Sequence, residues 1–243
     1  RGSDCHKDLC QKEAMLNIGA SYAPDRIEHL MFLDCDVMSF DRSWFRKIRD
    51  KLNDDNVVQC FKTAVDELDP EYSFVSLAYW CEHRSYNLHS NPGIGWAMSR
   101  LQYNTLGGFN PLFIEYSGDS AFVEEMIGID QFLVGQSRSL LRKCWKQYDM
   151  DYVDTNLIHL HHGRLEDRAY DLRKYIMGMW LNPITDVVEL DQCGLMKWID
   201  PGCPERISLK QLNWLRSTND LCFMFDMVQC PYNQIDLPID DAP

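Results

Sequence analysis

The segment His29–Phe40 constrains the fold most strongly. An apolar run, His29-Leu30-Met31-Phe32, indicates a buried β-strand. Asp34 and Asp36 follow one residue apart, where that strand should end. Because side chains alternate along a strand, Phe32, Asp34 and Asp36 are expected on one face. Two carboxylates on one face repel unless a cation lies between them, and hard divalent ions prefer oxygen ligands. The pattern predicts either an Mg²⁺ or Mn²⁺ site for a phosphate-bearing ligand or a solvated loop, since acids are common turn residues.

The rest of the chain alternates between strand-like and helix-like segments. Helices are expected over residues 12–23, 43–53, 117–128 and 165–177, and a short one ends at Gly107-Gly108; strands are expected over 57–61, 93–98 and 154–160, with 66–92 irregular. The inward residues predicted for the first two helices are Ala14, Met15, Ile18, Tyr22, Trp44, Phe45, Ile48 and Leu52. Such alternation predicts an α/β fold, a sheet with flanking helices, whose ligands bind at the carboxyl ends of strands. Residues 1–178 are expected to form this domain, and 179–243 a C-terminal appendage.

Composition excludes several classes of function. A formal net charge of −13 argues against nucleic-acid binding, and no apolar run approaches the roughly 20 residues that span a bilayer. The ten cysteines contain no Cys-x-x-Cys pair, which argues against a zinc ribbon. Cys35 and Cys60 are expected to be buried, reduced thiols. A reducing, cytoplasmic location is therefore expected, although four cysteines near the end of the sequence could form disulfides. The start at Arg1-Gly2-Ser3 indicates a cloning remnant or an internal fragment.

Two further polar clusters are expected at the ligand-binding edge. Asp119 follows Gly118 at a predicted helix start, where it acts either as a helix cap or as a general base. His159, His161 and His162 end the last predicted strand, and alternation places His162 on the opposite face from the other two. That arrangement excludes a site made of all three histidines. An imidazole together with carboxylate oxygens suits Mn²⁺ better than Ca²⁺.

Three other residues are candidates for ligand contact. Lys12 and Asn17 lie on the first helix, where they either bind a ligand or form a solvated face. Trp96 follows Gly93 and Gly95, which would allow the backbone to approach a ligand closely, so it is a candidate sugar platform or else a core residue.

Several motifs, in order, resemble those of bacterial and viral glycosyltransferases of the GT-A type, over roughly residues 11–198. The motifs are Gln11-Lys12-Glu13-Ala14-Met15-Leu16-Asn17-Ile18-Gly19, Phe32-Leu33-Asp34-Cys35-Asp36-Val37, Val57-Val58-Gln59-Cys60-Phe61, Gly95-Trp96-Ala97, Gly107-Gly108-Phe109, Ser117-Gly118-Asp119 and His159-Leu160-His161-His162-Gly163-Arg164. The resemblance implies that a nucleotide sugar, expected to be a UDP-sugar, donates its sugar to a glycan or other hydroxyl acceptor.

The resemblance also implies roles for single residues. Asp36 would hold the divalent metal on the donor diphosphate, Asp34 would contact metal or ribose, and His162 would complete the metal shell. Asp119, in the segment similar to that of galactosyltransferases, would bind the acceptor and act as base. Lys12, Asn17 and Trp96 are the other donor-contact candidates.

One feature departs from the family pattern. A GT-A domain opens with a strand-helix-strand unit that binds the nucleotide base, and this sequence starts after that unit. The unit is therefore expected to be missing or rebuilt. Two rival functions remain: a non-catalytic nucleotide- or carbohydrate-binding module, and a metal-dependent phosphohydrolase.

Overall fold

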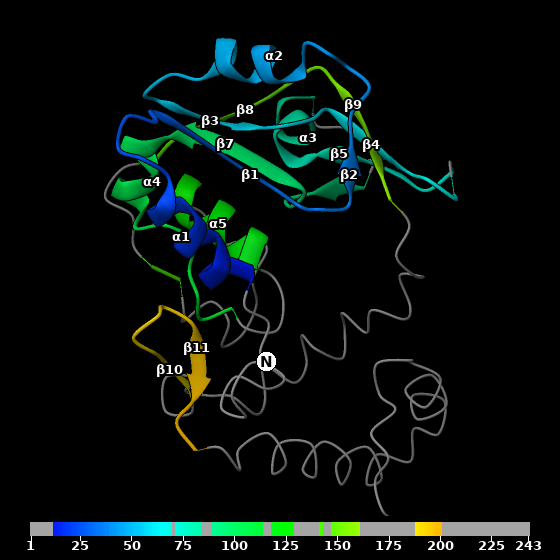
Figure 1. Cartoon of the computed structure of the whole chain (residues 1–243). Helices are drawn as coiled ribbons and strands as arrows, with labels where there is room; N and C mark the ends of the chain where they lie inside the picture. Colours follow the sequence, from blue (N-terminus) through cyan, green and yellow to red (C-terminus); the bar gives the residue numbers. More distant parts are fainter. Residues whose placement is uncertain are drawn as a thin grey trace, which may run out of the picture.

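The computed structural model describes residues 12–69, 71–83, 89–113, 118–128, 141–142, 147–160 and 188–200. The elements, in chain order, are α1 (Lys12–Tyr22), β1 (His29–Leu33), β2 (Val37–Met38), α2 (Trp44–Lys51), β3 (Asn56–Gln59), β4 (Thr63–Asp66), β5 (Ser73–Ser76), α3 (Leu77–His83), β6 (Ser90–Asn91), β7 (Gly95–Ser99), α4 (Arg100–Leu106), α5 (Gly118–Ile127), β8 (Asp149–Tyr152), β9 (Asn156–His159), β10 (Val188–Leu190) and β11 (Met196–Trp198). The expected mixed α/β fold is confirmed (Figure 1).

Two mixed sheets form the centre of the fold. One has the order β1-β7-β3-β8, the other β2-β9-β4-β5-β6, and β10 pairs with β11 separately. β1 and β3 run antiparallel to β7, whereas β3 and β8 run parallel. Short connecting segments join β1 to β2, β3 to β4 and β8 to β9. The first sheet therefore continues into the second.

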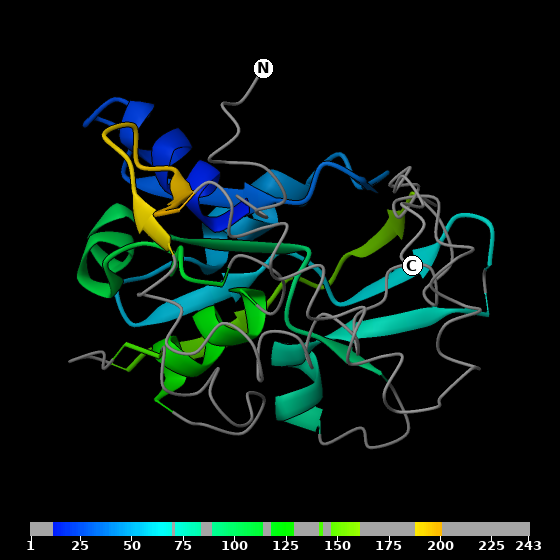
Figure 2. The ribbon, with the colours of Figure 1, turned by 90° about the horizontal axis from the view of Figure 1, so that it is seen from below.

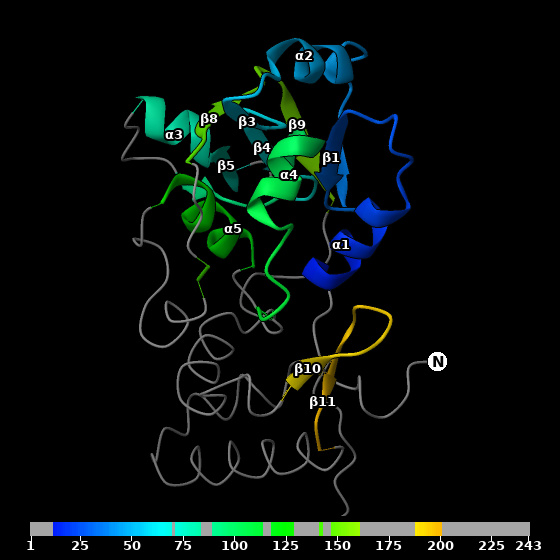
Figure 3. The same cartoon turned by 90° about the vertical axis from the view of Figure 1, so that its left-hand side faces the viewer.

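The two faces of the first sheet bury separate apolar clusters. Alternation sends Trp96 and Met98 to the cluster shared with α4 and α5, whereas Ala97 joins the cluster beneath α2. Figure 1 shows α2 on one side of the sheet and α1, α4 and α5 on the other, and Figure 3 gives the same layering from the side. Figure 2, seen from below, shows α1 beside the β10–β11 pair, where the α-carbon of Gly194 faces the side chain of Ile18.

Several predicted details need correction. The region predicted to be irregular, residues 66–92, contains β5, α3 and β6, because its strands are too short for a periodic pattern to show. Met15 and Tyr22 on α1 are exposed, as is Phe45 on α2. Because Trp44 and Ile48 fill the inward face of α2, their neighbour Phe45 must point elsewhere.

Other predictions fall on the edges of what the structure describes. The domain boundary at residue 178 and the helix over 165–177 lie outside the described residues. Cys60 is buried as expected, but Cys35 is exposed because it lies in the turn after β1 and not within the strand. Among the described helices, none is both long and apolar enough to cross a membrane.

Candidate active site

The candidate site lies where the end of β1 meets the first turns of α1 and α5. Lys12 is the first residue of α1, and Asp119 is the second residue of α5. Asp34 follows the last residue of β1. The Nζ atom of Lys12 lies 2.8 Å from Oδ1 of Asp34 and 3.1 Å from Oδ2 of Asp119. Three residues that the sequence assigned to donor and acceptor contact thus meet around one ammonium group.

The charges of this group influence one another. Burial works to lower the pKa of Lys12, but the charges of Asp119 and Asp34 outweigh it and raise that pKa, so Lys12 stays a cation. Burial raises the pKa of Asp119, and the Lys12 ammonium acts in the opposite direction. About a third of each side chain remains exposed, with values of 34% for Lys12, 30% for Asp34 and 32% for Asp119. A ligand from solution can therefore reach both carboxylates.

Glu13 adds a third carboxyl group behind Asp119. It is 5% exposed, and it fits because Gly118 has no side chain: a Cβ atom at Gly118 would overlap the Glu13 carboxyl group. Burial, reinforced by the charge of Asp119, raises the pKa of Glu13 to about 7. An acid with that pKa exchanges its proton near neutral pH.

Replacing Glu13 with Gln should stabilise the protein at neutral and higher pH. Between about pH 4.5 and 7 the folded protein binds more protons at Glu13 than the unfolded chain, so the free energy of unfolding falls as pH rises through that window. Because one pKa unit corresponds to about 1.4 kcal/mol, we expect Glu13→Gln to gain about 1–3 kcal/mol at pH 8 and to flatten that slope. Urea unfolding from pH 4.5 to 8, beside the exposed control Glu28→Gln, measures both. If Glu13→Gln leaves the pH dependence of the unfolding free energy unchanged, the raised pKa of Glu13 is contradicted.

Asp36 does not share the environment of Asp34. β1 ends at Leu33, so strand alternation does not extend to Asp36, and the prediction of one common face for the two acids is wrong. The turn carries Asp36 to the second sheet, where its Oδ2 atom lies 3.5 Å from Nε2 of His159. On the other side of the same imidazole, Oδ2 of Asp66 lies 3.6 Å from Nδ1. His159 is 8% exposed and thus a buried ring between two acids.

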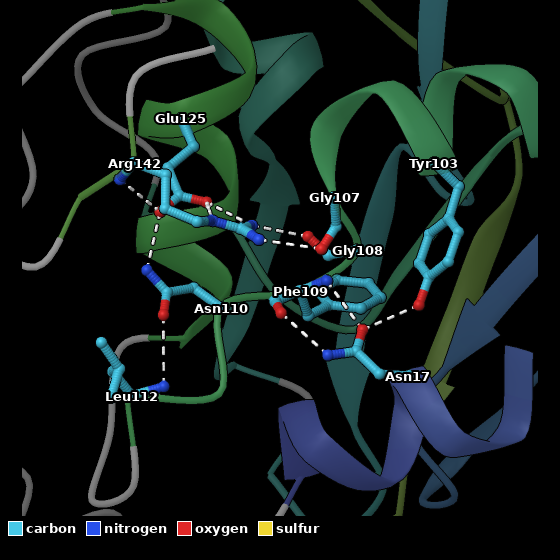
Figure 4. A network of polar contacts seen from close by, with 9 residues as sticks. All are labelled: Asn17, Tyr103, Gly107, Gly108, Phe109, Asn110, Leu112, Glu125 and Arg142. Carbon is cyan, nitrogen blue, oxygen red and sulfur yellow. Dashed lines mark hydrogen bonds and ion pairs between the residues drawn. The ribbon is translucent and has the colours of Figure 1, made fainter. Parts of the chain in front are cut away.

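Asn17 binds protein groups. Its Nδ2 group donates to the Phe109 carbonyl oxygen at 2.9 Å, and its Oδ1 atom accepts from the Phe109 N–H at 2.8 Å and the Tyr103 hydroxyl at 2.7 Å (Figure 4). These bonds occupy both ends of the amide. The structure therefore gives Asn17 a different task from the predicted donor contact: it fixes the loop after α4 against α1.

The same loop is held from its other side by an ion pair between the partly exposed Arg142 and the buried Glu125. Arg142 donates to the carbonyl oxygens of Gly107 and Gly108 at 2.9 and 2.6 Å, and its Nη2 lies 2.6 Å from Oε2 of Glu125 (Figure 4). Oε1 of Glu125 accepts from Asn110 at 2.8 Å. Because Glu125 belongs to α5, this network couples the loop to the helix that carries Asp119.

The prediction of Trp96 as a sugar platform is wrong. Its side chain is only 2% exposed, and its indole N–H donates to the Pro92 carbonyl oxygen at 2.8 Å. The ring packs 5.9 Å from that of Phe122, in the apolar cluster on that face of the sheet. A platform needs an open ring face, which a core tryptophan lacks.

The predicted metal ligands are only partly in view. In the described part of the chain, no three His, Cys, Asp or Glu side chains gather as a metal site would require. His162 lies outside the described residues. A carboxylate beside an imidazole is a pair that can bind Mn²⁺, and Asp36 and His159 form such a pair.

Sequence reasoning missed Glu13 and Asp66, and it noted Gly93 only as a place where the backbone could approach a ligand. Glu13 could have been found from the helical stripe that it shares with Leu16, Asn17 and Ala20, because the spacing marks one helix face even though two of its members are polar. No local pattern indicates Asp66, whose place depends on the pairing of β4 with β9.

Comparison with known proteins adds no relative: no protein-family model, curated protein or solved structure matches this chain.

Proposed function

We propose that the chain is a GT-A-type glycosyltransferase that moves a sugar from a nucleotide-diphosphate donor, a UDP-sugar, to a hydroxyl group of a glycan or similar acceptor. The observation that carries the proposal is the meeting of Lys12, Asp34 and Asp119, with the lysine ammonium within 3.2 Å of both carboxylates. The three come from separate segments, and each is partly open to solvent. A partly buried base beside a fixed cation is suited to transfer of a group between oxygens.

Asp119 is the proposed general base. As the acceptor oxygen bonds to the anomeric carbon of the donor sugar, the bond from that carbon to the diphosphate oxygen breaks, and the hydroxyl proton passes to Asp119. Burial raises the pKa of Asp119, which makes it a stronger base than a solvated aspartate. The Lys12 ammonium opposes the effect of burial by favouring the ionised form of this carboxyl group, and its hydrogen bonds orient the group before the acceptor arrives.

The proposed metal dependence concerns the leaving group. Asp36 and His162 would hold Mn²⁺ or Mg²⁺, which when bound would neutralise the charge that develops on the departing diphosphate. Net acidity of the chain supports this requirement, because a formal charge of −13 opposes binding of an anionic donor unless a cation accompanies it.

Incubation with a panel of nucleotide sugars and Mn²⁺, with and without simple glycan acceptors, tests the proposal. Release of nucleoside diphosphate that depends on metal and is stimulated by an acceptor is the expected result. Binding without release would indicate a non-catalytic module, and release of phosphate from simple phosphate esters would indicate a phosphohydrolase. Either outcome contradicts glycosyl transfer. A parallel series in the presence of a chelator measures any breakdown of the donor that does not depend on metal.

His162, and not His161, is expected to contribute to the metal site. Loss of one ligand should weaken Mn²⁺ binding of His162→Ala by at least about 10-fold. His161→Ala should bind nearly as the parent does, because neighbouring side chains would face opposite ways on the strand end that the sequence predicts there. Calorimetric titration of both variants with Mn²⁺ makes the comparison within one pair of adjacent residues. A larger loss in His161→Ala would reverse the assignment.

A further inference from the structure

A strained turn lies directly beneath the candidate site. Ile94 has φ of +73°, and it is the single non-glycine residue with positive φ among those described. The N–H of Gly95 donates to the carbonyl oxygen of Gly93 at 3.0 Å, which closes a three-residue γ-turn around Ile94. A γ-turn with positive φ at its centre is rare, and a β-branched residue fits that conformation poorly.

Side chains on either side of the turn hold it in this conformation. Gln59 is fully buried and donates to the carbonyl oxygens of Asn91 and Gly93 at 2.8 and 3.2 Å. The Asn91 side chain accepts from the Gly93 N–H at 2.6 Å. The Ile94 side chain is 4% exposed and anchors the turn in the apolar cluster beneath α2. A strained conformation persists when its surroundings over-determine it, and such conformations gather at functional sites.

The turn contacts the backbone of Asp34 and lies against the carboxylate of Asp119. The Asp34 N–H donates to the Ile94 carbonyl oxygen at 2.8 Å, which fixes the backbone of Asp34. Gly93 lies against the other acid: a Cβ atom there would come within 2.8 Å of Oδ2 of Asp119. One short segment therefore sets the places of two acids that are far apart in the sequence.

We propose that the γ-turn Gly93–Gly95 is the positioning element of the site, which sets the spacing of Asp34 and Asp119 across Lys12. Gly93 is a positioning residue because its missing side chain leaves the space that the Asp119 carboxylate occupies. The role deepens the proposed glycosyl transfer and rests on it for its kinetic consequence, but the geometric consequence can be measured without any turnover.

Gly93→Ala is the primary test. The added methyl group should displace the Asp119 carboxylate and loosen its contact with the Lys12 ammonium. Acetylation of surface lysines with a limiting amine-reactive reagent, followed by mass spectrometry, should then label Lys12 several-fold faster than in the parent. Lys47 and Lys51 are internal controls, since each is ion-paired and exposed to a similar degree, 46% and 40% against 34% for Lys12. Their labelling should not change.

Two further variants guard the interpretation. Gly19→Ala is the matched control, because a Cβ atom at Gly19 meets no atom within 4 Å, and it should label as the parent does. Asn91→Ala removes the acceptor of the Gly93 N–H without adding atoms. It should raise Lys12 labelling in the same direction, and it carries the test if Gly93→Ala does not fold. An equal rise at all three lysines, or no rise at Lys12, would overturn the proposal.

Turnover supplies a second readout that separates this proposal from the proposed function. Misplacement of a reacting group by about 1 Å can cost about 10²-fold in rate. Gly93→Ala should therefore lower kcat by about that factor with little change in the KM for the donor. When Asp119→Asn is already present, adding Gly93→Ala should lower kcat by less than about a further 2-fold. A rise in KM without a fall in kcat would overturn the positioning role. So would fully additive effects of the two substitutions on the activation free energy. If the parent has no transferase activity, the proposed function fails while the labelling result still decides the role of the turn.

Discussion

Asp119→Asn should reduce the transfer rate by about 10²–10⁴-fold while donor binding stays nearly intact. Loss of a positioned general base has an effect of this size. Asn keeps the shape of the side chain and can still accept a hydrogen bond from Lys12, but it cannot take a proton. Because Asp119 lies inside the first turn of α5, with its carboxylate directed to Lys12, the base interpretation gains support over a simple helix cap. The measurement is the transfer rate at saturating donor.

The pH dependence and a control sharpen this prediction. Burial raises the pKa of Asp119, so the parent rate should fall on the acid side at a pH above the range of a solvated aspartate. In Asp119→Asn this fall in rate at acid pH should be absent. Asp50→Asn, at an exposed position on α2, makes the same change of charge far from the site and should transfer normally. A near-parental rate for Asp119→Asn with an unchanged melting temperature would leave Asp119 a structural residue, and a retaining mechanism would then be preferred.

Much of the architecture could be predicted from local patterns. The strand before Asp34 and the helix that ends at Gly107 were both predicted, and the structure explains why they are well marked. Gly107 adopts φ of +76° as the C-cap of α4, and Ser99 and Gln102 form a capping box at its start. These signals act within one turn of helix, so a sequence displays them directly.

The geometry of the site depends on long-range pairing, which local patterns do not encode. Asp34 and Asp36 are separated because β1 ends at Leu33 and β2 joins a different sheet beside β9. The inward stripe of α1 was misplaced because Glu13 and Asn17, both polar, point to the site and the neighbouring loop. Ile94 adopts an unfavourable backbone angle only because residues such as Gln59 hold it there. Such departures from local preference are expected where a site is built.

The contrast between the two aspartates leads to the second large effect, expected for Asp36→Ala. We expect this variant to abolish the Mn²⁺-dependent part of nucleoside-diphosphate binding, because Asp36 lies beside an imidazole at the predicted metal turn. Asp34→Ala should act differently: it removes one of the two carboxylates that hold Lys12, so it should disturb the placement of that ammonium while leaving part of the metal dependence. Calorimetry of nucleoside-diphosphate binding with Mn²⁺ and with chelator, on both variants and on the charge-matched control Asp50→Ala, separates these expectations. If Mn²⁺ strengthens nucleoside-diphosphate binding by Asp36→Ala as much as by the parent, Asp36 is not a metal ligand. The main support for a metal-assisted leaving group would then be lost.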